Sequence, residues 1–120
     1  MREAAGSPCP IAPAAAAIFG RWATDVLWVL VNDGRMRFSE LRHRVPGVTP
    51  KVLTQRLRQL ERDGLVARSY HREVPPRVEY EATGLAVSLV PVFTALAAWS
   101  GEHQHEIETA RASYTGPSVA

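Results

Sequence analysis

The sequence has little cysteine, no recognisable catalytic motif and no marked excess of either charge over its whole length. Cys9 is the single cysteine among 120 residues, so no disulfide can form within the chain and a cytoplasmic protein is expected. We find no apolar run approaching the ~20 residues that cross a bilayer, and we therefore expect no membrane-spanning segment. The first eight residues also lack the charged-then-apolar layout of a secretory signal.

The sequence also lacks the motifs that are typical of catalytic sites and metal sites. There is no Gly-rich phosphate loop and no Gly-x-Ser-x-Gly turn, and Cys9 has no His or Asn partner in a recognisable signature. His103 and His105 are two residues apart, whereas two metal-binding histidines on one helix face are four apart. We therefore expect neither an enzyme nor a bound metal or cofactor, and we interpret the two histidines as part of a solvated tail.

Positive charge is concentrated in the middle of the chain. Residues 35–78 hold eleven of the fourteen Lys and Arg residues but four of the twelve Asp and Glu residues, although the net charge of the whole chain is +2. A basic segment between acidic ends is typical of a protein that binds a polyanion. Ten of the eleven bases are Arg, which makes bidentate contacts with phosphate and guanine. Charge alone does not exclude a merely solvated basic face.

The pattern of apolar residues, caps and turns predicts a mainly α-helical domain with a small β-hairpin, in the order α-α-(β)-α-α-β-β-α. Thr24 is expected to cap the second helix and Thr49 the fourth, and Pro91 is expected to bend the last helix. The expected helices cover residues 14–19, 24–32, 39–45, 50–63 and 83–103, the last fraying to about 112, and the expected extended segments cover 36–38, 65–70 and 77–82.

The two helices at 39–45 and 50–63 form a candidate helix-turn-helix. At ~100° per residue the second helix has an apolar face and an opposite polar face. Leu53, Leu57 and Leu60 make up the apolar face, and the polar face carries Lys51, Gln55, Arg58 and Arg62, with Thr54 at its edge. One face can anchor the helix in a core while the other presents donors suited to phosphates and base edges in a major groove. The free N–H groups after Thr49 can also hold a phosphate.

The hairpin that follows is interpreted as a wing, because Pro75 and Pro76 stiffen its loop. His71, Arg72 and Arg77 are placed to reach the backbone or minor groove of adjoining DNA. Lys and Arg on the solvent-exposed face of a helix usually serve only to keep the protein soluble. The whole order of short helix, turn, capped basic helix, strand, wing and strand favours DNA binding instead.

These residues also match a known family over most of the chain, from Cys9 to about His103. The chain resembles the bacterial HxlR-type winged helix-turn-helix transcriptional regulators, which are related to MarR-like proteins. The matching segments are Cys9-Pro10-Ile11, Gly20-Arg21-Trp22, Arg37-Phe38-Ser39-Glu40-Leu41, residues 46–57 (PGVTPKVLTQRL), 60–66 (LERDGLV) and 73–80 (EVPPRVEY), Thr83 and Ala98-Trp99. Two departures concern helix starts. Relatives usually carry Leu-Thr-x-x-Gly after the second wing strand, whereas here Gly84 directly follows Thr83, and Pro13 is unexpected in a helix beginning at Pro10.

The resemblance implies a cytoplasmic homodimer that binds double-stranded DNA at a pseudo-palindromic operator. It predicts one domain over residues 9–112, with a DNA-binding core at about 22–82, a disordered tail at 1–8 and a C-terminal tail at 113–120. The dimer would form mainly from the first and last helices, although their apolar residues could instead close a monomer core. The expected dimerisation residues are Ile18, Leu89, Val92, Phe93, Leu96 and Trp99.

In this reading the DNA contacts divide into two groups. Lys51, Thr54, Gln55 and Arg58 are expected in the major groove, and phosphate or wing contacts are expected from Thr49, Arg37, His71, Arg72 and Arg77. Two rival functions stay open. One is a winged-helix protein-interaction module that does not bind DNA, and the other is a ligand-binding chaperone or enzyme that uses the space between helices.

An effector is the last open question. Some relatives use a cysteine at the position of Cys9 as a switch for electrophiles or oxidants, and with one cysteine any disulfide here would join two chains. An inert N-terminal thiol is the alternative. Trp22, Trp28 and Trp99 could line a small-molecule pocket, but aromatic residues at helical spacing more often pack in a core.

Overall fold

A computed structural model describes residues 8–119, so the predicted tail at 1–8 lies almost entirely outside the described residues. These residues fall into two compact units, one ending at Leu89 and the other beginning at Val90, and each is considered by itself. The first unit carries α1 (Ala12–Ile18), α2 (Ala23–Asp33), β1 (Met36–Arg37), α3 (Phe38–Arg44), α4 (Pro50–Arg62), β2 (Val66–His71), β3 (Arg77–Ala82) and α5 (Gly84–Val87). The second carries α6 (Val90–Ser113).

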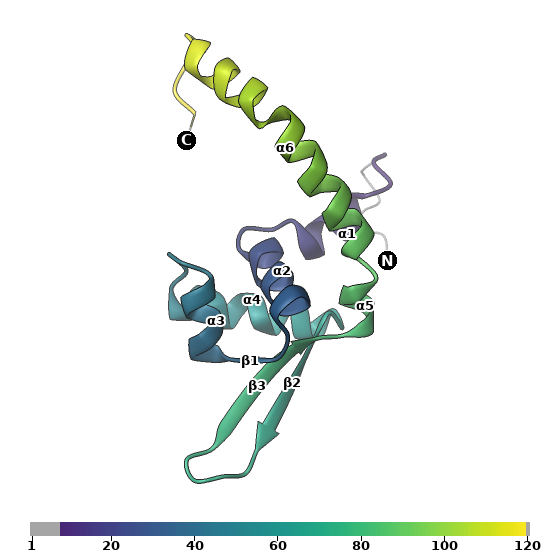
Figure 1. Cartoon of the computed structure of the whole chain (residues 1–120), viewed down its shortest axis with the longest axis vertical. Helices are drawn as coiled ribbons and strands as arrows, with labels where there is room; N and C mark the ends of the chain where they lie inside the picture. Colours follow the sequence, from purple (N-terminus) through teal and green to yellow (C-terminus); the bar gives the residue numbers. More distant parts are fainter. Residues whose placement is uncertain (1–7, 120) are drawn as a thin grey trace. The chain divides into compact units, whose positions relative to one another are not determined.

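The fold of the first unit is a helical body from which a β-hairpin projects (Figure 1). Its sheet has three antiparallel strands in the order β1-β3-β2, so the short β1 pairs with β3 at the base of the hairpin. In the longer ladder Arg68 lies opposite Tyr80 and His71 lies opposite Arg77. This is the predicted winged helix-turn-helix architecture, with each predicted strand within one residue of its observed bounds.

The core of the first unit is formed by leucines and valines from the three central helices. Val26, Leu27 and Leu30 from α2, Leu41 from α3 and the leucines of α4 are all at most 2% exposed. Burying one such side chain contributes roughly 1.5–3 kcal/mol. Because α4 supplies three of these residues, Leu53, Leu57 and Leu60, its orientation on the body is fixed by packing.

Two predicted helix starts differ from those observed. The helix α1 begins at Ala12, with Pro13 in its first turn, where the missing N–H costs nothing. Thr24 does not cap α2, which begins at Ala23 after Trp22 in a left-handed conformation (φ 73°). The Thr24 hydroxyl instead donates a hydrogen bond to the carbonyl oxygen of Ile18 at 2.6 Å, which ties α2 to the end of α1.

The single helix predicted at 83–103, fraying to about 112, is wrong in its continuity, although the observed helix ends at Ser113, one residue beyond the predicted frayed end. Thr83 caps the short helix α5, its hydroxyl accepting from the Ala86 N–H at 3.4 Å. The helical conformation is then interrupted at Ser88 and Leu89, and α6 runs from Val90 to Ser113. Pro91 lies in the first turn of α6, so it starts a new helix and does not bend a continuous one.

Residues 84–113 contradict the expectation that no segment of the chain is long and apolar enough to cross a bilayer. A window of 18 residues within this stretch has a mean hydropathy of 1.6, so the segment is long and apolar enough to cross a membrane by length and composition alone. A core helix of a soluble protein passes the same test, so this property does not place the chain in a bilayer.

Candidate nucleic-acid interface

The helix-turn-helix is held together by short-range caps. The Glu40 carboxylate accepts a hydrogen bond from the Arg37 backbone N–H at 2.8 Å, which fixes the start of α3. Gly47, at φ 92°, makes the turn that follows. Thr49 then caps α4 as predicted, with its hydroxyl accepting from the Val52 N–H at 3.2 Å and Pro50 in the first position. These caps set where α4 begins and therefore which side chains it exposes.

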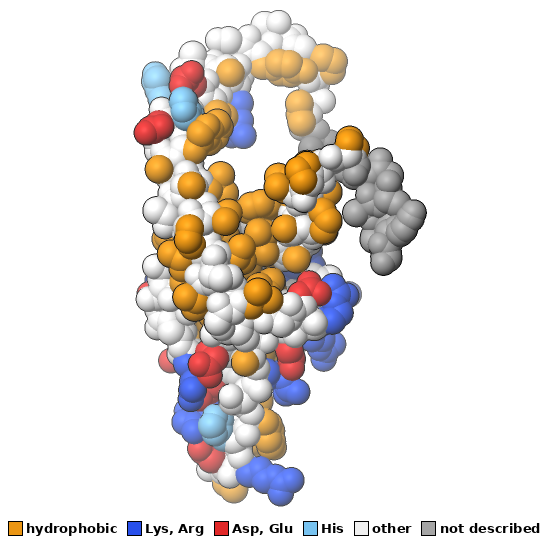
Figure 2. Space-filling view, turned by 90° about the vertical axis from the view of Figure 1, so that its right-hand side faces the viewer, with side chains coloured by type: hydrophobic (Ala, Val, Ile, Leu, Met, Phe, Trp, Pro, Cys, Tyr) orange, Lys and Arg blue, Asp and Glu red, His pale blue; other side chains and the backbone are white. Residues whose placement is uncertain are grey.

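The amphipathic character predicted for α4 is confirmed. Its leucine face is buried, while Lys51, Gln55, Arg58 and Arg62 on the opposite face are exposed. Thr54 is half-buried at the edge, and its hydroxyl donates to the Pro50 carbonyl oxygen at 2.8 Å. Figure 2 shows Lys and Arg side chains over the lower part of the molecule, around the helical body and along the hairpin.

The hairpin has two faces of different chemistry, because side chains alternate along each strand. One face carries Arg68 and Tyr80, which lie opposite each other in the β2–β3 ladder. The other face carries His71 and Arg77, which are also paired, together with Glu79. The predicted wing residues His71, Arg72 and Arg77 are therefore not equivalent.

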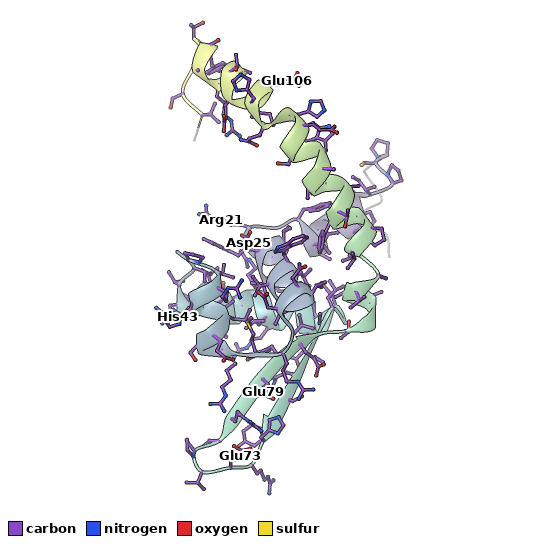
Figure 3. All side chains as sticks on the ribbon, viewed as in Figure 1. Arg21, Asp25, His43, Glu73, Glu79 and Glu106 are labelled. Carbon is purple, nitrogen blue, oxygen red and sulfur yellow. The ribbon has the colours of Figure 1, made fainter. Side chains whose placement is uncertain are left out.

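The face with His71 and Arg77 is an ion-pair cluster centred on Glu79, labelled on the hairpin in Figure 3. The Glu79 carboxylate lies 3.6 Å from Arg35, 3.2 Å from His71 and 3.7 Å from Arg77. Arg77 also pairs with Glu73 at 2.8 Å, and Arg35 pairs with Glu81 at 2.9 Å. Three carboxylates thus offset the two guanidinium groups here, whereas Arg72 in the loop is exposed and forms no ion pair with any of residues 8–119.

A small pocket of about 240 Å³ lies between α4 and the sheet. It is lined by Thr54, Leu57, Arg58, Glu61, Arg68 and Tyr80. Burial raises the pKa of the Tyr80 phenol; among the smaller effects, Arg68 and Arg58 lower this pKa and Glu61 raises it. The sequence did not identify Arg68 and Tyr80 as candidate site residues. The alternation of side chains places both on one face of the hairpin only once the β2–β3 register is known.

The other predicted phosphate contact and the candidate sensor are both at the surface. Arg37 is exposed at the junction of β1 and α3. Cys9 is exposed and lies just ahead of α1, where its carbonyl oxygen accepts from the Ala12 N–H at 3.2 Å. Ile11 is the N-terminal flanking residue of α1, so the Cys9 thiol is outside the helix.

The predicted dimerisation residues are found in both units. In the first, Ile18 is buried and Leu89 is half-buried. On α6, Phe93 is buried, while three apolar side chains at helical spacing are exposed, namely Val92, Leu96 and Trp99. Further along α6 the His103 imidazole lies 4.9 Å from the Trp99 ring and contacts Glu106 at 2.6 Å. Within residues 8–119 no three His, Cys, Asp or Glu side chains are grouped as metal ligands.

Comparison with known proteins identifies the family to which this arrangement belongs. Residues 17–108 match the HxlR-like helix-turn-helix family. The chain belongs to that family. An uncharacterized HTH-type transcriptional regulator of Methanothermobacter thermautotrophicus is 43% identical over 99 residues, which cover 80% of this chain and 75% of the relative. The HTH-type regulator YkvN of Bacillus subtilis is 44% identical over 89 residues, covering 74% and 75%.

Among solved structures, the redox regulator HypR in its reduced form is similar, with a TM-score of 0.78 and 33% identity. The match covers 84% of this chain and 99% of HypR. The resemblance inferred from the sequence motifs is thus confirmed, and the chain is a transcriptional regulator of the helix-turn-helix type. Proteins of this family are not enzymes, which removes the enzyme alternative.

Proposed function

We propose that this regulator is a cytoplasmic homodimer that binds a pseudo-palindromic DNA operator, with one α4 helix of each protomer in a major groove. The observation that carries the proposal is the two-faced α4. Its three leucines are at most 1% exposed, and its opposite face presents Lys51, Gln55 and Arg58 to solvent. A helix anchored on one side with donors on the other is what major-groove reading requires.

The flanking contacts follow from exposure and charge. Thr49 and the first N–H groups of α4 face a DNA phosphate at the helix N-terminus. Arg37 takes a second phosphate, and Arg72 at the wing loop reaches the adjoining backbone or minor groove. His71 and Arg77 contribute less, because Glu73 and Glu79 offset their charge.

The homodimer uses the exposed apolar side chains of α6. Val92, Leu96 and Trp99 are 45%, 44% and 52% exposed, which is unfavourable for residues of this kind in water. A second copy covers them in a symmetric interface. The likeness to HypR, a redox regulator, supports an oxidant or electrophile as the effector, acting on the exposed Cys9 thiol.

The test is fluorescence-anisotropy titration of a duplex from the upstream region of the gene, beside a scrambled duplex and a salt series. A sequence-specific regulator prefers its operator by at least ~10³-fold and loses affinity steeply with salt. Repeating the titration after thiol oxidation, with Cys9→Ser as the control, tests the effector.

Two other results have distinct meanings. Weak and equal binding to both duplexes places the operator elsewhere in the genome, and in vitro selection from random duplexes then locates it. No salt-dependent binding to any duplex contradicts DNA binding and favours a protein-interaction module.

A further inference from the structure

The pocket between α4 and the sheet, defined above by Thr54, Leu57, Arg58, Glu61, Arg68 and Tyr80, has the composition of an anion site. Thr54, Arg58 and Glu61 lie on one stripe of α4, bordering the exposed face that carries Lys51 and Gln55. Arg68 and Tyr80 come from the sheet and lie opposite each other in the ladder. The pocket therefore lies where the exposed face of α4 meets the base of the wing.

The charges of this pocket do not cancel. Arg68 is paired with Glu61, but its Nε lies 3.6 Å from the carboxylate oxygen, longer than a good hydrogen bond. Arg58 is exposed, and no ion pair within residues 8–119 involves its guanidinium. Two guanidinium groups and one carboxylate leave one net positive charge, which a single monoanion would neutralise.

Tyr80 supplies a neutral donor beside these charges. Because burial raises the pKa of its phenol, the hydroxyl keeps its proton well above neutral pH. A protonated phenol can donate a hydrogen bond to an anionic oxygen. The pocket thus offers two guanidinium groups and one hydroxyl donor around a space of about 240 Å³.

We propose that this pocket binds one phosphodiester group of the DNA backbone, with Arg68 and Tyr80 as ligands and Arg58 at its edge. The assignment rests on the proposed DNA binding. When α4 lies in the major groove, the strand that borders the groove passes between α4 and the wing. On binding, Arg68 exchanges its long contact with Glu61 for a charge-assisted hydrogen bond to phosphate. A free phosphate ion offers the same charged oxygens, so the experiment distinguishes binding of the DNA backbone from binding of a free phosphate ion.

The experiment measures binding of the full-length protein to its operator duplex and to a scrambled duplex over a salt series. Arg68→Gln is expected to weaken binding about tenfold on both duplexes alike, and to make the salt slope shallower by about one unit. Arg68→Lys keeps the charge and is expected to restore most of the slope. Tyr80→Phe removes a donor without changing charge, so affinity falls several-fold while the slope is unchanged.

Matched controls are Arg111→Gln and Tyr114→Phe, two exposed residues of the second unit, which are expected to bind as the wild type does. Thermal unfolding of each variant verifies that it is folded. Duplexes carrying one neutral methylphosphonate in place of a phosphate then locate the contact. One such duplex is expected to bind wild type more weakly but to cause no further loss in Arg68→Gln.

The outcomes separate this proposal from the proposed function. If wild type binds the operator and both Arg68→Gln and Tyr80→Phe bind equally well, the pocket assignment is overturned while DNA binding stands. If wild type binds no DNA, the proposed DNA binding and the pocket assignment are both overturned. Titration with inorganic phosphate at constant ionic strength, monitored by NMR of the arginine Nε–H signals, tests whether the pocket binds a free phosphate ion. Saturable shifts of Arg58 and Arg68 at millimolar phosphate without any DNA contact would overturn the backbone assignment in favour of a free anion.

Discussion

The guanidinium of Arg77 lies 2.8 Å from the carboxylate of Glu73, across the loop that joins the two long strands of the wing. Glu79 lies 3.7 Å from the same guanidinium, so two carboxylates oppose its single charge. Arg72, one residue before Glu73, is exposed. Two arginines that look equivalent in the sequence of the wing therefore differ in how much positive charge they offer to DNA.

The first prediction compares these two arginines. Replacing Arg72 by Gln is expected to weaken binding to all duplexes alike and to lower the salt slope by about one unit. Replacing Arg77 by Gln is expected to change the slope much less, because Glu73 and Glu79 already offset its charge. Anisotropy titrations over a salt series measure both slopes. Equal loss in the two variants would mean that the Arg77 ion pairs break on the DNA.

The second prediction concerns Arg58 on the exposed face of α4. If its guanidinium reads a base edge, Arg58→Ala costs about 1–3 kcal/mol and relaxes specificity at one operator position. Competition among single-base operator variants measures this directly, with Arg62→Ala as a neighbour on the same face. A loss that is uniform over all variants would instead make Arg58 a phosphate contact of the pocket that it shares with Arg68.

The third prediction is that the start of α4 depends on the Thr49 cap. Removing its hydroxyl leaves the Val52 N–H without the acceptor that now lies 3.2 Å away. Thr49→Ala is expected to lower the free energy of unfolding by about 1 kcal/mol. Urea denaturation measures the change, and Thr115→Ala, outside the helices, is the control. An unchanged midpoint would show that neighbouring contacts hold the first turn without the cap.

The fourth prediction concerns the pH dependence of stability at Tyr80. Burial raises the pKa of its phenol above the ordinary value of 10.0. On raising the pH above about 10, the unfolded chain therefore loses this proton before the folded chain does, and the folded state loses stability. The difference in urea midpoint between wild type and Tyr80→Phe is expected to be constant below pH 10 and to move against wild type above it. A difference that does not change with pH would mean that the phenol titrates normally.

The parts of this structure that could be predicted from the sequence are those fixed by local chemistry. Thr49, Pro50 and Gly64 mark both ends of α4, and the spacing of its leucines defines the buried face. Each of these signals acts within one or two turns of chain. For that reason the helix-turn-helix and the exposed donors of α4 were both predicted correctly.

The parts that could not be predicted depend on partners distant in sequence. The pairing of Arg68 with Tyr80 follows from the strand register, and Arg35 meets Glu81 only because β1 joins the same sheet. The start of α2 was wrong because Trp22 adopts a positive φ, which its residue type does not favour. The pocket between α4 and the sheet was missed because its members come from one helix and two strands.

The last prediction tests the exposed apolar side chains of α6. Leu96 is 44% exposed, and in a symmetric dimer each substitution acts twice. Leu96→Asp loses the part of the roughly 1.5–3 kcal/mol for full burial of a leucine that dimerisation would add in each copy, and it adds a charge to the interface. We therefore expect the variant to be monomeric at micromolar concentration in sedimentation analysis, and to bind a half-site as before while losing its preference for the full operator. Thr109→Asp, which adds the same charge at an exposed polar position of α6, is expected to stay dimeric. If Leu96→Asp stays dimeric while Thr109→Asp dissociates, the dimer forms through the other side of α6.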